Sequence, residues 1–159
     1  METYKLIGIL LLAVSGTVGA YLLNRTATDA LRRAEGWLTL VRTVGTQVEC
    51  FALPARDILR GLDPELLRRC GYEGEGVPES LWELAGRCEL RDEETERLVR
   101  GFCKEFGTVY RAEQVQSCAY YAAGLRDRRQ ALAAALPNRK KMNSTLCVSA
   151  ALALVILLL

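Results

Sequence analysis

The sequence predicts an all-α protein, a helical bundle whose long antiparallel helix pair is continuous with a transmembrane helix at each end. Both ends of the chain are apolar and the middle is densely charged, since Glu2 and Lys5 are the only charged residues outside 25–141. Apolar residues in the middle recur at steps of three and four, as in packed helices, and no stretch alternates as a strand does. We therefore expect an N-terminal transmembrane helix (1–24), a cytosolic helical domain (25–141) and a C-terminal transmembrane helix (142–159).

The first apolar run, residues 6–23, carries no charged side chain. As a helix it is about 27 Å long, close to the hydrocarbon thickness of a bilayer. An alternative is a cleaved signal peptide, because Lys5 precedes the run and Val18-Gly19-Ala20 offers a small-residue cleavage site. The protein would then be exported and anchored by its tail. The run continues past that site to Leu23, so we favour an uncleaved span.

The second apolar run, residues 143–159, ends in Ala-Leu-Val-Ile-Leu-Leu-Leu. Basic residues near both runs lie mostly on the side of the middle domain, and such residues are retained on the cytoplasmic side of a membrane. We therefore expect both termini to point outward and the middle domain to face the cytosol. These residues are Arg25, Arg32, Arg33, Arg42, Arg126, Arg128, Arg129, Arg139, Lys140 and Lys141.

Each run is followed or preceded by a heptad seam of apolar residues, and the two seams have equal length. We predict that they face each other in an antiparallel stalk about 33 Å long, with positions 34 and 132 at the same height. Stalk and membrane hairpin would then form one rigid unit. Arg129 interrupts the second seam, and Pro54 and Pro137 each end or kink a helix. The seams are Ala30, Ala34, Trp37, Val41, Val44, Val48 and Phe51, and Val115, Cys118, Ala122, Leu125, Leu132 and Leu136.

Between the seams the chain predicts short helices. One covers 55–62, and Asp63-Pro64 begins another that Gly71 ends. A third covers 78–87. The acidic residues from Asp92 begin a longer helix, where they favour the helix dipole, and Gly107 ends or bends it. The expected core residues of the last two helices are Leu81, Trp82, Leu84, Leu98, Val99, Phe102 and Phe106.

The chain has no histidine, which excludes histidine bases, histidine metal ligands and the usual nucleophilic triads. It also lacks the glycine-rich loops that bind nucleotide phosphates. We read Asp92-Glu93-Glu94 as a solvated helix start rather than a metal site. No catalytic residue, cofactor or metal is predicted. We expect Arg126, Arg128 and Arg129 to contact lipid headgroups, or only to set the membrane topology, rather than to bind nucleic acid, because they lie near a span.

Five cysteines lie outside the predicted spans, an odd number without a CxxC pair, so we expect small buried thiols in a reducing compartment. A membrane-anchored regulator that uses these thiols is the alternative. Of Tyr120 and Tyr121, only one can face a seam, because adjacent helical positions point apart. Gly16 with Ala20, and Ser149 with Ala153, are small pairs that let helices pack closely.

The layout and the C-terminal half together resemble the stage III sporulation protein AB family of endospore-forming bacteria. The most specific stretch is 98–114. Phe106-Gly107 occupies the positions where the family has Leu-Gly, and Gln114 occupies the position of a Gln in the family. Phe102 belongs to the apolar run that precedes them. Tyr110 stands where the family has Asp, and Cys147 and Ala150 replace glycines of the last span. These departures indicate a divergent member.

The resemblance implies a non-enzymatic platform in the mother-cell membrane around the forespore, within the channel apparatus that joins the two cells. Its soluble part is similar to the helical domains of type II secretion platform proteins. The implied partners are a cytosolic ATPase, stage III sporulation protein AA, other membrane components of the complex and the lipid bilayer. We expect the ATPase to dock on the short helices of 55–91.

Overall fold

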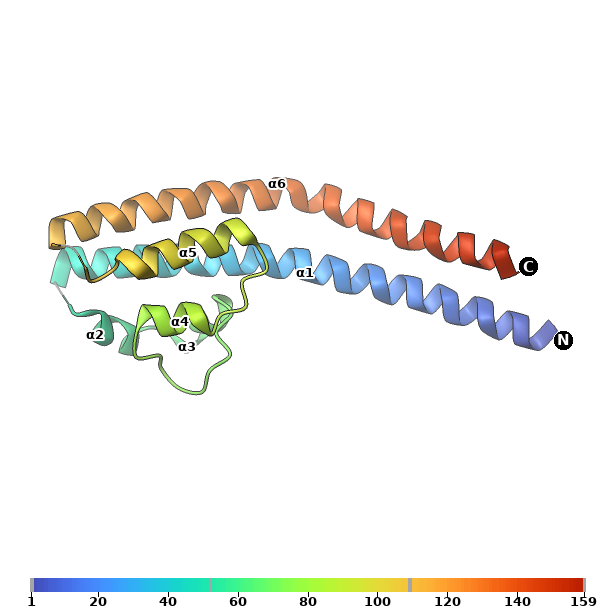
Figure 1. Cartoon of the computed structure of the whole chain (residues 1–159), viewed down its shortest axis with the longest axis horizontal. Coiled ribbons are helices and arrows are strands. Elements are labelled where there is room, and N and C mark those ends of the chain that lie inside the picture. The colour runs from blue at the N-terminus through green and yellow to red at the C-terminus, as the bar shows by residue number, and fades with distance from the viewer. Residues whose placement is uncertain (1, 52, 109, 159) are drawn as a thin grey trace. The chain divides into compact units, whose positions relative to one another are not determined.

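The computed structural model describes the backbone of residues 2–51, 53–108 and 110–158, and side chains at 8, 14–51, 53–108 and 110–156. The all-α prediction is confirmed, and the two long helices pack antiparallel (Figure 1). Within the described residues, the one β-type pairing is an isolated bridge between Tyr72 and Cys88. The helices are α1 (Glu2–Phe51), α2 (Ala55–Arg60), α3 (Pro64–Arg69), α4 (Leu81–Gly86), α5 (Glu93–Glu105) and α6 (Arg111–Leu158).

The chain divides into two compact units. One combines Met1–Asp29 with Ala133–Leu159, which we call the terminal pair, and the other is Ala30–Leu132, the central domain. Among the described residues, no helix has both the length and the hydropathy needed to cross a bilayer. Part of each predicted span lies outside the described side chains, at 1–7, 9–13 and 157–159.

In the central domain, the long helices run side by side along the predicted seams. Glu35 accepts a hydrogen bond from Arg129 (3.2 Å), close to the predicted pairing of 34 with 132. Nearer the turn, Gly45 packs on Cys118 so closely that an added Cβ would lie 3.1 Å from the Cys118 Cβ. The buried seam residues are Ala30, Ala34, Trp37, Val41, Val44, Val48, Cys118, Ala122, Leu125 and Leu132, while Val115 and Leu136 are half-buried.

Phe51 does not belong to this seam, because 67% of its surface is exposed. Arg111, the first residue of α6, donates from Nε to the Val48 carbonyl at 3.1 Å, and its guanidinium also contacts the Glu49 carbonyl. The first turn of α6 therefore lies opposite 48–49, and no turn of α6 is left to cover Phe51.

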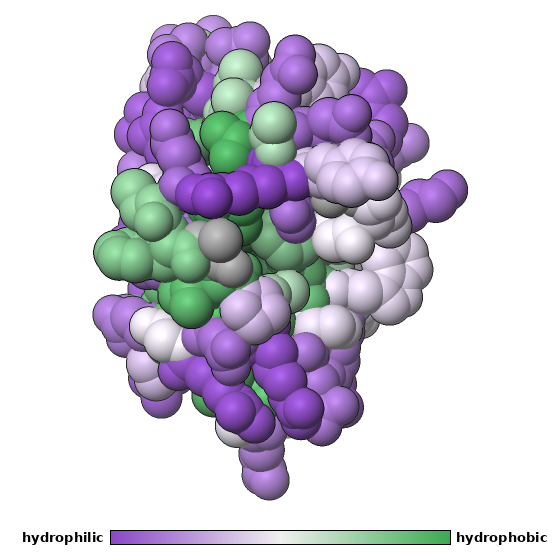
Figure 2. Space-filling model, turned by 90° about the vertical axis from the view of Figure 1, so that its left-hand side faces the viewer, coloured by the Kyte–Doolittle hydropathy of each residue, from purple (hydrophilic) through white to green (hydrophobic). Residues whose placement is uncertain are grey.

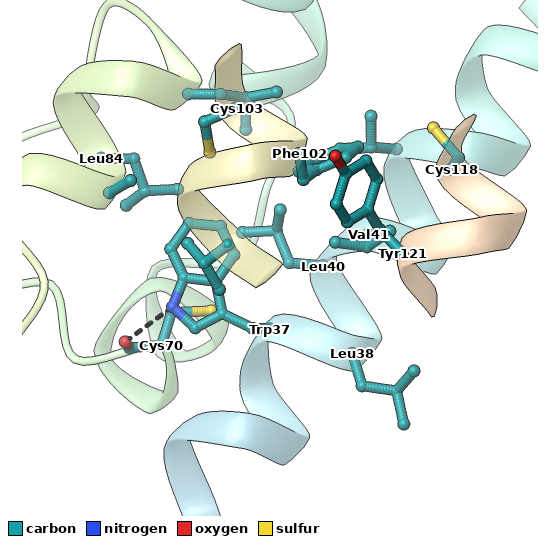
Figure 3. Packing of buried hydrophobic residues seen from close by; sticks show 14 of the residues in the cluster. Trp37, Leu38, Leu40, Val41, Cys70, Leu84, Phe102, Cys103, Cys118 and Tyr121 are labelled. Atoms are coloured by element: carbon teal, nitrogen blue, oxygen red, sulfur yellow. Dashed lines mark hydrogen bonds between the residues drawn. The ribbon is translucent and has the colours of Figure 1, made fainter. Parts of the chain in front are cut away.

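Helix α1 has a second buried side, which the short helices cover. Trp37 and Leu40 are fully buried, and Figure 3 shows them among side chains from α4 and α5. The Trp37 Nε1 donates a hydrogen bond to the Cys70 carbonyl at 3.1 Å, which ties α1 to the end of α3. Gly36 lies against the same backbone, because an added Cβ there would be 2.7 Å from the Arg69 carbonyl carbon.

Helix α3 begins at the predicted Asp63-Pro64, whereas α2 ends at Arg60 rather than at 62, and α4 covers 81–86 rather than 78–87. Asp63 caps α3 by accepting from the Glu65 amide (2.9 Å), and Gly71 follows the helix with a φ of +91°. The predicted burial of Trp82 is wrong, because 56% of its surface is exposed. Helix α4 is short, and its inward positions are taken by the i, i+3 and i+4 residues Leu81, Leu84 and Ala85.

The terminal pair is held by small and polar residues. A Cβ added at Gly16 would lie 3.2 Å from the Ala151 Cβ, so the helices approach closely there. The Asn143 amide donates to the Asn24 Oδ1 at 3.3 Å, and Asn24 donates to the Ser144 hydroxyl at 3.5 Å. Helix α6 continues through Pro137 to Leu158, so this proline does not end it.

Candidate functional site

Phe102, in the segment that carries the family resemblance, is the centre of an aromatic cluster between α5 and α6. Its side chain is fully buried, and its ring centroid lies 5.4 Å from that of Phe106 and 5.8 Å from that of Tyr121. Edge-to-face contacts of this kind stabilise packing beyond the area that they bury. Tyr121 is the member of the tyrosine pair that turns inward, and 69% of the Tyr120 surface is exposed.

The turn between α5 and α6 depends on Gly107, whose φ of +85° belongs to the left-handed region that glycine favours. Tyr110, 86% exposed, immediately precedes α6, and its carbonyl accepts the first helical hydrogen bond from the Gln114 amide (2.9 Å). Tyr110 thus stands at the N-cap, where Asp is a preferred residue. The Gln114 side chain is half-buried and makes no hydrogen bond to a described residue.

A two-bond ion pair joins Asp92, the N-cap of α5, to Arg128 of α6. Arg128 donates from Nε (2.8 Å) and from its terminal nitrogen (2.6 Å), one bond to each carboxylate oxygen. Thr95 adds its amide (2.9 Å) and hydroxyl (2.7 Å). The hydrogen bonds from Arg128 are the main cause that lowers the pKa of Asp92 below its usual value.

The open cleft beside this pair is lined by Asp92, Glu93, Glu94, Arg97 and Arg128. Its acids and bases pair with one another, since Glu94 lies 3.4 Å from Arg128 and 3.0 Å from Arg97. The predicted contact of Arg128 and Arg129 with headgroups is not supported, because Arg128 is held by Asp92 and Arg129 by Glu35. Among the described residues no group of acids and cysteines is arranged to hold a metal ion.

The thiols differ in burial. Cys70, Cys103 and Cys118 are buried, Cys88 and Cys147 are half-buried, and Cys50 is exposed. Burial raises the pKa of Cys103 to about 12 and that of Cys118 to about 11, and it also raises that of Cys70. Since the thiolate is the reactive form, the buried thiols are poorly suited to redox sensing near neutral pH.

This difference predicts the outcome of thiol titration. In a background with Cys88→Ala and Cys147→Ala at pH 7, a water-soluble disulfide reagent should modify Cys50 rapidly and the buried thiols only after unfolding. A Cys50→Ser change should remove the fast phase and leave the slow phase unaltered. A fast phase that persists in the folded Cys50→Ser protein would contradict the burial of these thiols. It would support the alternative of a membrane-anchored regulator that uses its thiols.

Several large apolar side chains of the central domain are exposed to solvent. Phe51, Leu53 and Tyr110 lie at the end where α1 stops and α6 starts, and Figure 2 shows apolar atoms at this end between hydrophilic side chains. Trp82 of α4 and Val77 of the preceding loop, 47% exposed, form a second group. Exposed aromatic side chains of this kind are typical of contact surfaces.

The fold and these surfaces define an all-α protein with an antiparallel pair of long helices and a small domain of short helices packed on α1. The chain belongs to the stage III sporulation protein AB family, whose profile matches residues 5–159. The resemblance inferred from 98–114 is thereby confirmed. No curated protein and no solved structure gives a significant match. Membership implies a role in the stage III sporulation apparatus, in which this family is generally a non-catalytic component.

Proposed function

We propose that the chain is a non-enzymatic membrane platform within the channel apparatus between mother cell and forespore. In this proposal the terminal pair lies in the mother-cell membrane, and the central domain faces the cytosol and docks the ATPase stage III sporulation protein AA. The observation that carries the proposal is the distribution of side chains in the terminal pair.

The residues between the helices of the terminal pair are small and polar, and most of its large exposed side chains, apart from the basic residues, are apolar. Gly16, Asn24 and Ser144 lie between the helices. Large apolar side chains point outward. In water this exposure costs a free energy of about 25 cal/mol for each Å² of apolar surface, and in the hydrocarbon of a bilayer this cost is absent. Close contact through small residues is how helices associate in a bilayer. The outward side chains are Val14, Val18, Tyr21, Leu22, Leu23, Met142, Leu146, Val148, Leu152, Leu154 and Ile156.

The continuity of α1 supports an uncleaved anchor over an exported protein. The helix continues through Val18-Gly19-Ala20, the candidate cleavage site, and Gly19 packs near the Cys147 sulfur, 3.8 Å from an added Cβ. Mass spectrometry of the mature protein should find its first residues intact, and a mature chain that begins near residue 21 would establish the exported alternative instead.

For the docking surface we propose the exposed group on α4 and its preceding loop. Trp82 is exposed, while its neighbours Leu81 and Leu84 belong to the core. The core therefore does not depend on the indole, which is accessible to a partner. Tryptophan is the residue most enriched among those that dominate binding energies. Val77, in the loop that precedes α4, is exposed as well.

The test is capture of the matching ATPase by the full-length protein in membranes. We expect Trp82→Ala to weaken binding by about ten-fold or more, the usual effect of losing a dominant aromatic contact. Tyr120→Ala is the matched control, because it removes an exposed aromatic from α6 and should leave binding unchanged. Absence of binding by the unaltered protein would refute the docking role, and equal losses in both variants would refute this surface.

A further inference from the structure

Four basic side chains form a collar on the terminal pair: Arg25 on α1, and Arg139, Lys140 and Lys141 on α6. All four are exposed. None of them forms an ion pair or a hydrogen bond with a described residue. Asp29, the one acidic side chain described in this unit, is not bonded to any of them.

The asparagine pair fixes the position of this collar. Asn24 and Asn143 are hydrogen-bonded, so they lie at the same height on the two helices. Arg25 follows Asn24, and residues 139–141 precede Asn143. Because the helices are antiparallel, all four cations lie on the same side of the asparagine pair, within about 6 Å along the helix axis. The exposed apolar side chains of Leu23 and Leu146 lie on the other side.

The arginines of the central domain behave differently, because most of them have an acidic partner. Arg33 lies 3.7 Å from Glu89, and Arg100 lies 2.7 Å from Glu96. Ten of the sixteen cationic side chains of the central domain thus have an acidic partner, whereas none of the four in the collar has one among the described residues. A set of unpaired cations at the border of an apolar surface fits an anionic partner that is absent from the chain itself.

We infer that the basic collar binds the phosphates of anionic lipid headgroups at the membrane surface. This inference rests on the proposed membrane position of the terminal pair. Arginine offers two parallel donors to a phosphate and lysine a compact charge, so the collar supplies both kinds of contact. Each cation near an anionic membrane surface strengthens the attraction by about five-fold at moderate salt. If the basic residues only set the orientation of the protein in the membrane, no preference for anionic over neutral lipids is expected.

The test compares lipids bound to the purified full-length protein by native mass spectrometry, in micelles with equal amounts of phosphatidylglycerol and phosphatidylcholine. We expect the unaltered protein to retain phosphatidylglycerol about five-fold or more in excess. The collar variant, Arg25→Gln with Arg139→Gln, Lys140→Gln and Lys141→Gln, should retain both lipids equally. The control, Arg42→Gln with Arg60→Gln and Lys104→Gln, loses three exposed and unpaired cations of the central domain and should keep the preference.

The outcomes separate the inference from the proposal beneath it. Equal retention of both lipids by the unaltered protein, or loss of preference in the control, would overturn the collar. Flotation with neutral vesicles tests membrane insertion on its own, and a protein that fails to float refutes the proposed function whatever its lipid preference. Excess glycerol phosphate should not displace the bound lipid, and displacement would identify a site for free phosphate instead.

Discussion

Replacing Gly36 by alanine is expected to destabilise the central domain by about 3 kcal/mol, at the upper end of what overpacking costs. An added Cβ would lie 2.7 Å from the Arg69 carbonyl carbon, 2.8 Å from its oxygen and 2.9 Å from the Cys70 amide nitrogen. All three are backbone atoms, so no side chain can rotate away. Helix α1 and the end of α3 must separate, which weakens the bond from Trp37 to the Cys70 carbonyl.

The sign of this prediction opposes the intrinsic preference of the residues. Gly36 lies inside α1, where alanine is normally the better helix former by up to about 1 kcal/mol. The control is Gly86→Ala at the end of α4, because an added Cβ meets nothing within 4 Å there. Denaturant unfolding in detergent, followed by tryptophan fluorescence and circular dichroism, measures both. A Gly36→Ala protein as stable as the unaltered one would show that this contact is looser than described.

The heptad pattern could predict the side of α1 that faces α6, because a helix partner repeats every three to four residues. It could not predict the second buried side at Leu40, because α4 and α5 cover it and their positions depend on contacts distant in sequence. Trp82 was misjudged for a local reason. Its size favoured burial, but the spacing of Leu81, Leu84 and Ala85 already accounted for the inward positions of a short helix.

Charged partners were also beyond what the sequence predicts. The interpretation of Arg128 rested on its closeness in sequence to a terminal run, whereas its partner Asp92 lies 36 residues away. The acidic start of α5 was predicted correctly, but nothing in the pattern distinguishes the acid that an arginine holds from those that solvent surrounds. By contrast, the sequence already shows the cations beside the terminal runs. The structure adds that they lack partners among the described residues and that they lie on one side of the Asn24–Asn143 hydrogen bond.

Replacing Asp92 by alanine is expected to lower the free energy of unfolding by about 2–4 kcal/mol, because it removes a helix cap and leaves Arg128 with only the longer contact to Glu94. The pair is largely shielded, with 11% of the Asp92 side chain and 25% of the Arg128 side chain exposed. Asp63→Ala is the matched control. Asp63 caps α3 through one amide, has no arginine bound and should cost only about 1 kcal/mol.

The same contact predicts how stability depends on pH. The hydrogen bonds from Arg128 lower the pKa of Asp92 in the folded state, so the stabilisation is fully present above the unfolded value of about 3.9. It should decline as the pH falls below that value, because the unfolded chain then binds the proton more readily. The difference in stability between the unaltered protein and Asp92→Asn should thus be constant from pH 7 to about pH 5 and shrink below about pH 4. A difference that stays the same at pH 3 would show that Asp92 acts by its hydrogen-bond geometry rather than by its charge.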